Sequence, residues 1–120
     1  MKESGENYLE TIYNLYKENG FVKSVDISNA LNVSRPSVNR ASKVLQDKGL
    51  ITQVHYGNIE LTEKGIKKAE EIIQKHNNLT TFLIKVLELA PEEAEYNACR
   101  IEHIITDNAM NKINEYLKKN

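Results

Sequence analysis

The segment "VDISNALNVSRPSVNRASKVLQDKGLI", residues 25–51, decides the fold because it predicts two helices joined by a tight turn. Apolar residues at helical spacing predict a short helix from about Val25 to Leu31, and Ser24 is a suitable N-cap for it. The three residues Asn32-Val33-Ser34 then form the expected turn. A short helix, a tight turn and a second helix are typical of a helix-turn-helix.

The second helix of the pair has clear start and stop signals. Ser34 can cap it, and Pro36 lies in its first turn, where the missing N–H of proline costs little. Gly49 should end it. The apolar residues expected to face the core are Val38, Val44 and Leu45.

The flanking segments extend this pair to a winged helix-turn-helix. Before it, residues 6–20 predict a helix that ends at Asn19-Gly20. Its apolar positions at helical spacing are Tyr8, Leu9, Ile12, Leu15 and Tyr16. After it, residues 50–62 predict a two-stranded hairpin around Tyr56-Gly57-Asn58. In a winged helix-turn-helix, the second helix of the pair docks in the DNA major groove.

The second helix carries most of the residues expected to contact DNA. From Arg35 to Lys48 there are four basic residues and one acidic residue, although the whole chain has a formal net charge of −1. Phosphate binding depends on such a local patch, and arginine and asparagine can also bind base edges. The predicted DNA-binding residues of this helix are Arg35, Pro36, Ser37, Asn39, Arg40 and Lys43. In the hairpin, Tyr56 is predicted to contact DNA, with His55 and Asn58 beside it. The alternatives are a solvated basic face and a winged helix that binds a protein.

The second half of the chain predicts only helices. Thr62 can cap the first of them. The expected helices run from about Glu63 to Val86, from Pro91 onward, and from Thr106 or Asp107 to near Leu117. The fold class is therefore mainly α with a small β-hairpin, divided into a winged helix-turn-helix over residues 1–70 and a helical domain over residues 71–120.

The stretch "NACRIEHIITDN", residues 97–108, contains three potential metal ligands. On a helix, Cys99, Glu102 and His103 are spaced i, i+3 and i+4, which places them on one face. A thiol, a carboxylate and an imidazole can all bind metals, but three ligands do not fill the shell of a divalent ion. The segment therefore predicts part of a metal site.

Five blocks of sequence together resemble the DtxR/MntR family of metal-dependent transcriptional repressors. They are residues 6–16, 25–51, 56–65, 75–83 and 98–110, and they extend over nearly all of the 120 residues. The resemblance implies an N-terminal DNA-binding domain over residues 1–70 and a metal-binding and dimerisation domain over residues 71–120, with a divalent metal as co-repressor. Because longer members add an SH3-like domain, a chain of this length is expected to be the short form.

The resemblance also implies a set of ligands. The primary site matches Glu10, His76, Cys99, Glu102 and His103, with Asn7 where manganese-type members have an acid. Cys99 matches the iron-type members, where manganese-type members have glutamate, whereas Glu10 matches the manganese-type members and is lacking in the iron-type ones, so this chain is a hybrid. An ancillary site of the iron-type members matches His76, Glu95 and Thr80, of which Thr80 is a poor ligand.

Oxygen and imidazole ligands suit Mn²⁺, Fe²⁺, Co²⁺, Ni²⁺ or Zn²⁺. A thiolate from Cys99 would shift the preference away from Mn²⁺, so Fe²⁺ is expected first and Mn²⁺ next. The expected partners are a second copy of the chain and double-stranded DNA with a palindromic operator, because a two-fold symmetric dimer reads two half-sites.

Three other classes of function compete with this interpretation. One is a metal-independent winged-helix regulator, in which Glu102 and His103 form a polar pair between helices. Another is a thiol redox sensor that uses Cys99, and the third is an enzyme. An enzyme is the least favoured because Cys99 and His103 lack an orienting third group, so none is predicted.

Composition favours a cytoplasmic protein with no membrane partner. No apolar run approaches the roughly 18–20 residues that span a bilayer, and residues 1–10 do not look like a signal peptide. The single cysteine fits a reducing compartment.

Overall fold

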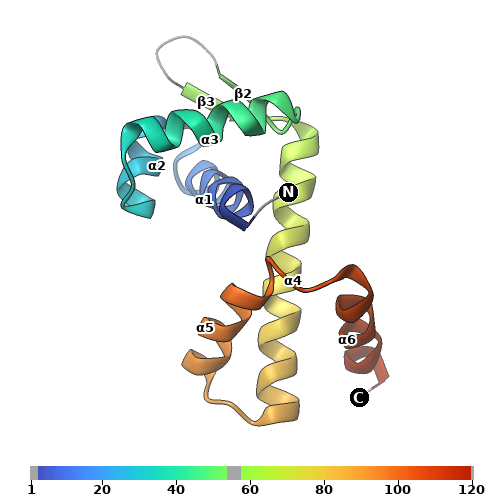
Figure 1. Cartoon of the computed structure of the whole chain (residues 1–120). Helices are drawn as coiled ribbons and strands as arrows, with labels where there is room; N and C mark the ends of the chain where they lie inside the picture. The colour runs from blue at the N-terminus through green and yellow to red at the C-terminus, as the bar shows by residue number, and fades with distance from the viewer. Residues whose placement is uncertain (1–2, 54–57, 120) are drawn as a thin grey trace. The chain divides into compact units, whose positions relative to one another are not determined.

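The computed structural model describes residues 3–53 and 58–119, and the chain divides into two compact units, Met1–Glu70 and Glu71–Asn120. The first unit contains α1 (Glu3–Asn19), β1 (Val22–Lys23), α2 (Ser24–Leu31), α3 (Arg35–Asp47), β2 (Ile51–Gln53) and β3 (Asn58–Leu61) (Figure 1). Helix α4 (Glu63–Leu87) begins in the first unit and continues into the second, which also contains α5 (Pro91–Ile101) and α6 (Asp107–Lys119). None of the helices in the described ranges combines the length and the apolarity needed to cross a lipid bilayer.

The first three helices form the predicted helix-turn-helix around an apolar core. Leu9 and Ile12 of α1, Ile27 of α2, and Val38 and Leu45 of α3 are all completely buried. Burial of such side chains is the main favourable term in folding. The sequence pattern therefore identified most of this core correctly.

The cap of α2 differs from the prediction. The backbone N–H of Lys23 donates to Asp26 Oδ2 at 3.3 Å, and Lys23, not Ser24, is the N-cap. Ser24 is instead the first helical residue and is buried. Asp26, three residues into the helix, accepts the N–H of the N-cap residue, as the acidic residue of a capping box does.

The expected cap of α3 is confirmed, but one expected core residue is wrong. Ser34 Oγ accepts a hydrogen bond from the Ser37 N–H at 3.2 Å. Val44 was expected to face inward, yet its side chain is 49% exposed. The buried face of α3 instead includes Ser42, which is four residues after Val38 and therefore on the same side of the helix.

The sheet has one strand more than the hairpin predicted. Its order is β1-β3-β2, with antiparallel pairing on both sides of β3. Val22 pairs with Ile59 and Lys23 pairs with Asn58. A strand of two residues is too short to produce an alternating pattern, so it was not predicted. The predicted turn residues Tyr56 and Gly57, and His55 beside them, lie outside the described residues.

The N-terminal turn of α4 packs closely against the end of α3. Thr62 Oγ1 accepts the N–H of Gly65 at 3.0 Å and donates to Gly49 O at 2.7 Å. A Cβ added to Gly65 would lie 1.9 Å from the carbonyl oxygen of Leu50. Gly65 is therefore required by this approach of two backbone segments.

The second unit is an assembly of α5 and α6 against the second part of α4. Its buried core consists of Leu79, Leu83, Ala94, Ala98 and Met110. Around this core, the partly buried residues are Phe82, Leu89, Ile101, Ile105 and Ile113. The observed helices follow the predicted ones, although α6 extends two residues past Leu117 to Lys119.

Candidate metal centre and DNA-binding surface

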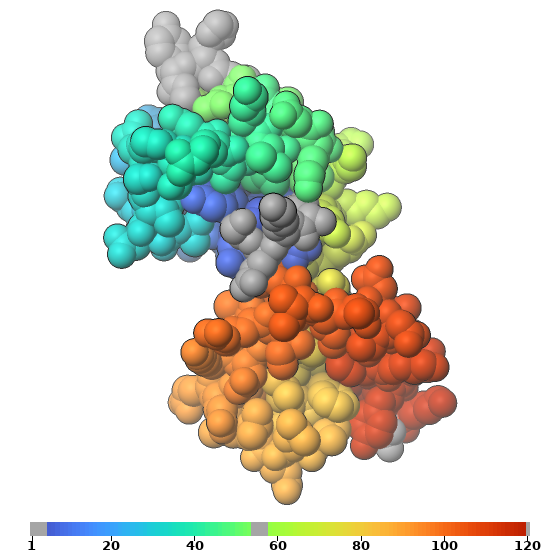
Figure 2. Space-filling view, in the orientation of Figure 1, coloured from blue at the N-terminus to red at the C-terminus, as the bar shows by residue number. Residues whose placement is uncertain are grey.

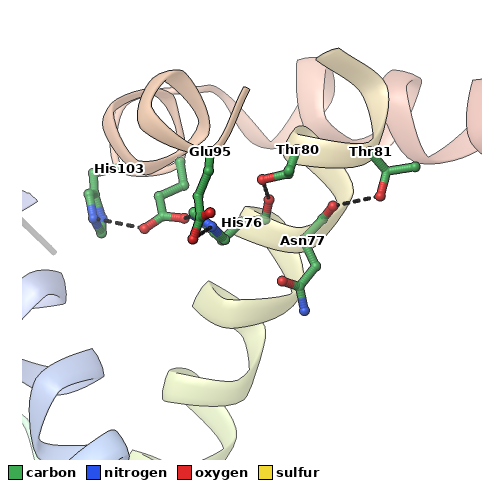
Figure 3. Close-up of polar contacts among 7 residues, drawn as sticks. His76, Asn77, Thr80, Thr81, Glu95 and His103 are labelled. Atoms are coloured by element: carbon green, nitrogen blue, oxygen red, sulfur yellow. Dashed lines mark hydrogen bonds and ion pairs between the residues drawn. The ribbon is translucent and has the colours of Figure 1, made fainter. Parts of the chain in front are cut away.

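A buried carboxylate lies between two imidazoles in the second unit. Only 1% of Glu102 is exposed. Its Oε2 is 2.9 Å from His76 Nδ1, and its Oε1 is 3.2 Å from His103 Nε2. Figure 3 shows His76 and His103 on separate parts of the chain, with dashed lines for these contacts. Each oxygen of one carboxylate therefore contacts a different histidine.

The local structure explains why these residues meet. His76 lies on α4, whereas Glu102 is the C-cap of α5 and its N–H bonds to Ala98 O at 2.9 Å. The chain then turns, with the Ile104 N–H bonded to Ile101 O at 3.0 Å. The small residues Ala94 and Ala98 are completely buried and allow α5 to pack closely in the core. This packing brings the C-terminal end of α5 to His76.

The predicted helical face of Cys99, Glu102 and His103 is interrupted because α5 ends at Ile101. The side chain of Cys99 is exposed, whereas Glu102 is buried. Residues predicted to share one helix face can therefore differ in their exposure to solvent. Cys99 remains a predicted ligand.

His76 faces a second acidic residue through its other ring nitrogen. His76 Nε2 is 3.9 Å from Glu95 Oε1, and the side chain of Glu95 is 71% exposed (Figure 3). Thr80 Oγ1 donates to the His76 carbonyl oxygen at 2.8 Å, so this hydroxyl is used within α4. The structure thus groups His76 with both Glu95 and Glu102.

The donor set fits a divalent transition metal. Imidazole nitrogens and carboxylate oxygens are the ligands that Mn²⁺, Fe²⁺ and Zn²⁺ accept. A buried carboxylate is costly unless it is paired or binds a metal. Glu102 offers carboxylate oxygens as ligands, and each of the two histidines that contact it offers a ring nitrogen. The remaining predicted ligands, Asn7 and Glu10, lie half-buried on α1 of the first unit.

The predicted DNA-binding residues of α3 lie on the surface of the first unit. Those that are exposed are Arg35, Pro36, Asn39, Arg40 and Lys43, and Ser37 is half-buried. In Figure 2 the side chains of α3, coloured teal to green, form a continuous part of the visible surface of this unit. Asn58 is half-buried at the start of β3, and Tyr56 lies outside the described residues.

Comparison with known proteins identifies the class. Residues 1–59 match the iron dependent repressor, N-terminal DNA binding domain, and residues 62–120 match the iron dependent repressor, metal binding and dimerisation domain. These matches, with the winged helix-turn-helix fold, define a metal-dependent DNA-binding transcriptional regulator. The chain belongs to the DtxR/MntR family of metal-dependent transcriptional repressors.

The relatives include both iron-type and manganese-type regulators. An uncharacterized HTH-type transcriptional regulator of Methanocaldococcus jannaschii is 34% identical over 120 residues, which is 99% of this chain and 96% of that protein. The transcriptional regulator MntR of Escherichia coli is 31% identical over 118 residues, covering 98% of this chain and 76% of that protein. The crystal structure of T. acidophilum IdeR has a TM-score of 0.77 and 27% identity, covering 94% of this chain. This chain spans 53% of that structure.

Proposed function

We propose that this protein is a metal-activated repressor that binds DNA as a homodimer, with Fe²⁺ as its preferred co-repressor and Mn²⁺ next. The contact of Glu102 with both His76 and His103 is the observation that most strongly supports this proposal. A buried carboxylate in contact with imidazoles is expected of a metal centre, because carboxylates and imidazoles are both ligands of divalent transition metals. Catalysis plays no part in the proposed role.

The proposed ligand set combines this cluster with residues assigned by resemblance. Glu102, His76 and His103 provide its centre, and Glu95 is a weaker ligand beside His76. The resemblance adds Glu10, with Asn7 as a weaker ligand, and Cys99. A thiolate from Cys99 favours Fe²⁺ over the harder Mn²⁺.

The proposed regulation links metal binding to DNA binding. Glu10 belongs to the unit that contains α3, whereas His76, Glu102 and His103 belong to the other unit. Because the proposed ligand set takes residues from each unit, metal binding is proposed to act on the recognition helix α3. A bound divalent ion would supply the positive charge that holds these ligands. Such coupling between two ligands is typically about 1–3 kcal/mol, and DNA must then increase metal affinity equally.

The proposed DNA target is a palindromic operator. The protein is proposed to act in the cytoplasm, where it can bind the chromosome. A homodimer presents two copies of α3, and half-sites one helical turn apart require these to be about 34 Å from each other. Arg35, Asn39 and Arg40 are proposed to contact base edges, and Lys43 to contact phosphate.

The test is an anaerobic titration of apo-protein with Fe²⁺, Mn²⁺ and Zn²⁺, measuring bound metal per subunit, Tm and DNA affinity. His103→Ala should lose the metal-dependent rise in Tm and the gain in DNA affinity, because its imidazole contacts Glu102. Glu92→Gln is the control, since Glu92 is an exposed residue outside the proposed ligand set and outside the predicted DNA-binding residues. Wild-type protein that binds DNA equally well with and without metal would contradict the proposal and favour a metal-independent regulator.

A further inference from the structure

Three side chains are joined by hydrogen bonds along the N-terminal half of α3. Ser34 Oγ accepts the Ser37 N–H at 3.2 Å and lies 2.9 Å from Ser37 Oγ. Arg40 Nη2 donates to Ser37 Oγ at 3.2 Å. The helix cap is therefore connected through Ser37 to the guanidinium of Arg40, and we call these three residues the cap chain.

Arg40 occupies the outer face of α3. Val38 is completely buried, and two residues further along an α-helix correspond to a rotation of about 200°. Arg40 therefore points away from the core, and it is exposed. Of all positions in the first half of α3, this one lies most nearly opposite the buried side.

The cap chain leaves enough donors on Arg40 to recognise a base. A guanidinium has five N–H donors, and one N–H on Nη2 is used by Ser37. The other N–H groups can donate to the O6 and N7 atoms of guanine, which is the commonest specific contact of arginine with DNA. Because Ser37 holds the guanidinium, less side-chain freedom remains to be lost on binding.

The other two basic residues of this surface are not held in this way. Within the described residues, neither Arg35 nor Lys43 has a side-chain hydrogen bond or ion pair. A lysine presents a compact charge without a planar fork, and it more often contacts phosphate than a particular base. Of these three basic side chains, Arg40 is therefore the one whose orientation is restrained for a directional hydrogen bond.

We propose that Arg40 recognises a guanine in each half-site and that Ser37 is the positioning residue that holds its guanidinium for this contact. The inference rests on the proposed function, in which α3 enters the major groove. It adds to that function a base preference and the residue on which the preference depends.

The experiment selects DNA from a randomised duplex library with the metal-loaded full-length protein, then measures affinities for the selected site and its single-base variants at one salt concentration. Wild type should require a guanine at one position of each half-site and lose about 10–100-fold in affinity when it is replaced. Arg40→Gln should lose this discrimination. Ser37→Ala should lower this discrimination several-fold, and Ser37→Thr, which keeps the hydroxyl, should restore it.

Other outcomes would overturn the inference. If Ser37→Ala discriminates between bases as well as the wild type does, with an unchanged Tm, Ser37 does not position Arg40. An Arg40→Gln variant that binds all sequences equally more weakly, with a smaller salt dependence, would make Arg40 a phosphate contact. Metal-loaded wild type that selects no sequence would instead contradict the proposed function itself. Ser42→Ala is the matched control, because it removes a hydroxyl from the buried side of α3, away from Arg40, and it should keep the wild-type discrimination.

Discussion

The outer face of α3 and the C-terminal end of α5 use polar side chains in opposite ways. On α3, Arg40 and Lys43 are exposed to solvent, whereas Val38 and Leu45 on the other side of the helix are buried. At the end of α5, Glu102 is buried and contacts two histidines. One region therefore keeps its charged side chains in solvent, and the other gathers polar side chains inside the fold.

The difference shows how to distinguish a structural position from a functional one. Exposed charges are ordinary on any protein, so α3 requires its fold context before DNA binding can be inferred. A buried carboxylate with two imidazoles has a desolvation cost, and such groups are retained where they are paired or bind metals. Burial is thus informative for Glu102, while exposure alone says little about Arg40.

The largest expected effect concerns the two faces of α3. Leu45→Ala should lower the free energy of unfolding by about 2–5 kcal/mol, because it removes a completely buried side chain and leaves a cavity. Val44→Ala, one residue earlier and 49% exposed, should change it by no more than about 0.5 kcal/mol. Urea unfolding of both variants measures the difference. Equal losses would mean that Val44 is a core residue after all.

The next effect tests the buried end of α5. Glu102→Gln should weaken metal binding by about 100-fold or more, because the amide keeps the size of the side chain but loses the charge between His76 and His103. Calorimetric titration with Mn²⁺ and Fe²⁺ gives the affinities. Glu92→Gln is the control, since Glu92 is an exposed acid in the first turn of the same helix. If the two variants bind metal equally well, the cluster is a polar contact without a metal role.

A smaller effect is expected at the N-terminus of α3. Ser34→Ala should reduce the free energy of unfolding by about 1 kcal/mol, because the Ser37 N–H loses its side-chain acceptor. Ser37→Ala keeps that backbone donor and the Ser34 hydroxyl, so it should reduce the free energy of unfolding by less than Ser34→Ala does. Thermal or urea unfolding compares the two. A larger loss in Ser37→Ala than in Ser34→Ala would contradict the assigned cap.

The smallest effect on stability is expected for Cys99→Ser. The side chain is exposed, so the free energy of unfolding should change by no more than about 0.5 kcal/mol. If the thiolate binds metal, the ratio of Fe²⁺ to Mn²⁺ affinity should fall, because serine offers no soft ligand. Competition titrations with both ions measure this ratio. An unchanged ratio would remove the Cys99 sulfur from the ligand set.

The sequence predicted the helix-turn-helix because its signals are local. Ser34 marks the start of α3 through its side-chain oxygen, and Pro36 and Gly49 mark its ends through their backbone conformation. Val38 and Leu45 lie at helical spacing. The family resemblance also followed from the order of such blocks. The metal ligands were proposed from the spacing of Cys99, Glu102 and His103 and from this resemblance, and they stay a prediction.

Only the tertiary structure decided features that depend on distant neighbours. The pairing of Val22 with Ile59 creates a third strand from two residues, and the close backbone of Leu50 explains the glycine at position 65. Val44 is exposed although it is apolar, whereas Glu102 is buried although it is acidic. Spacing fixes which side of a helix a residue occupies, but packing decides what covers that side and where the helix ends.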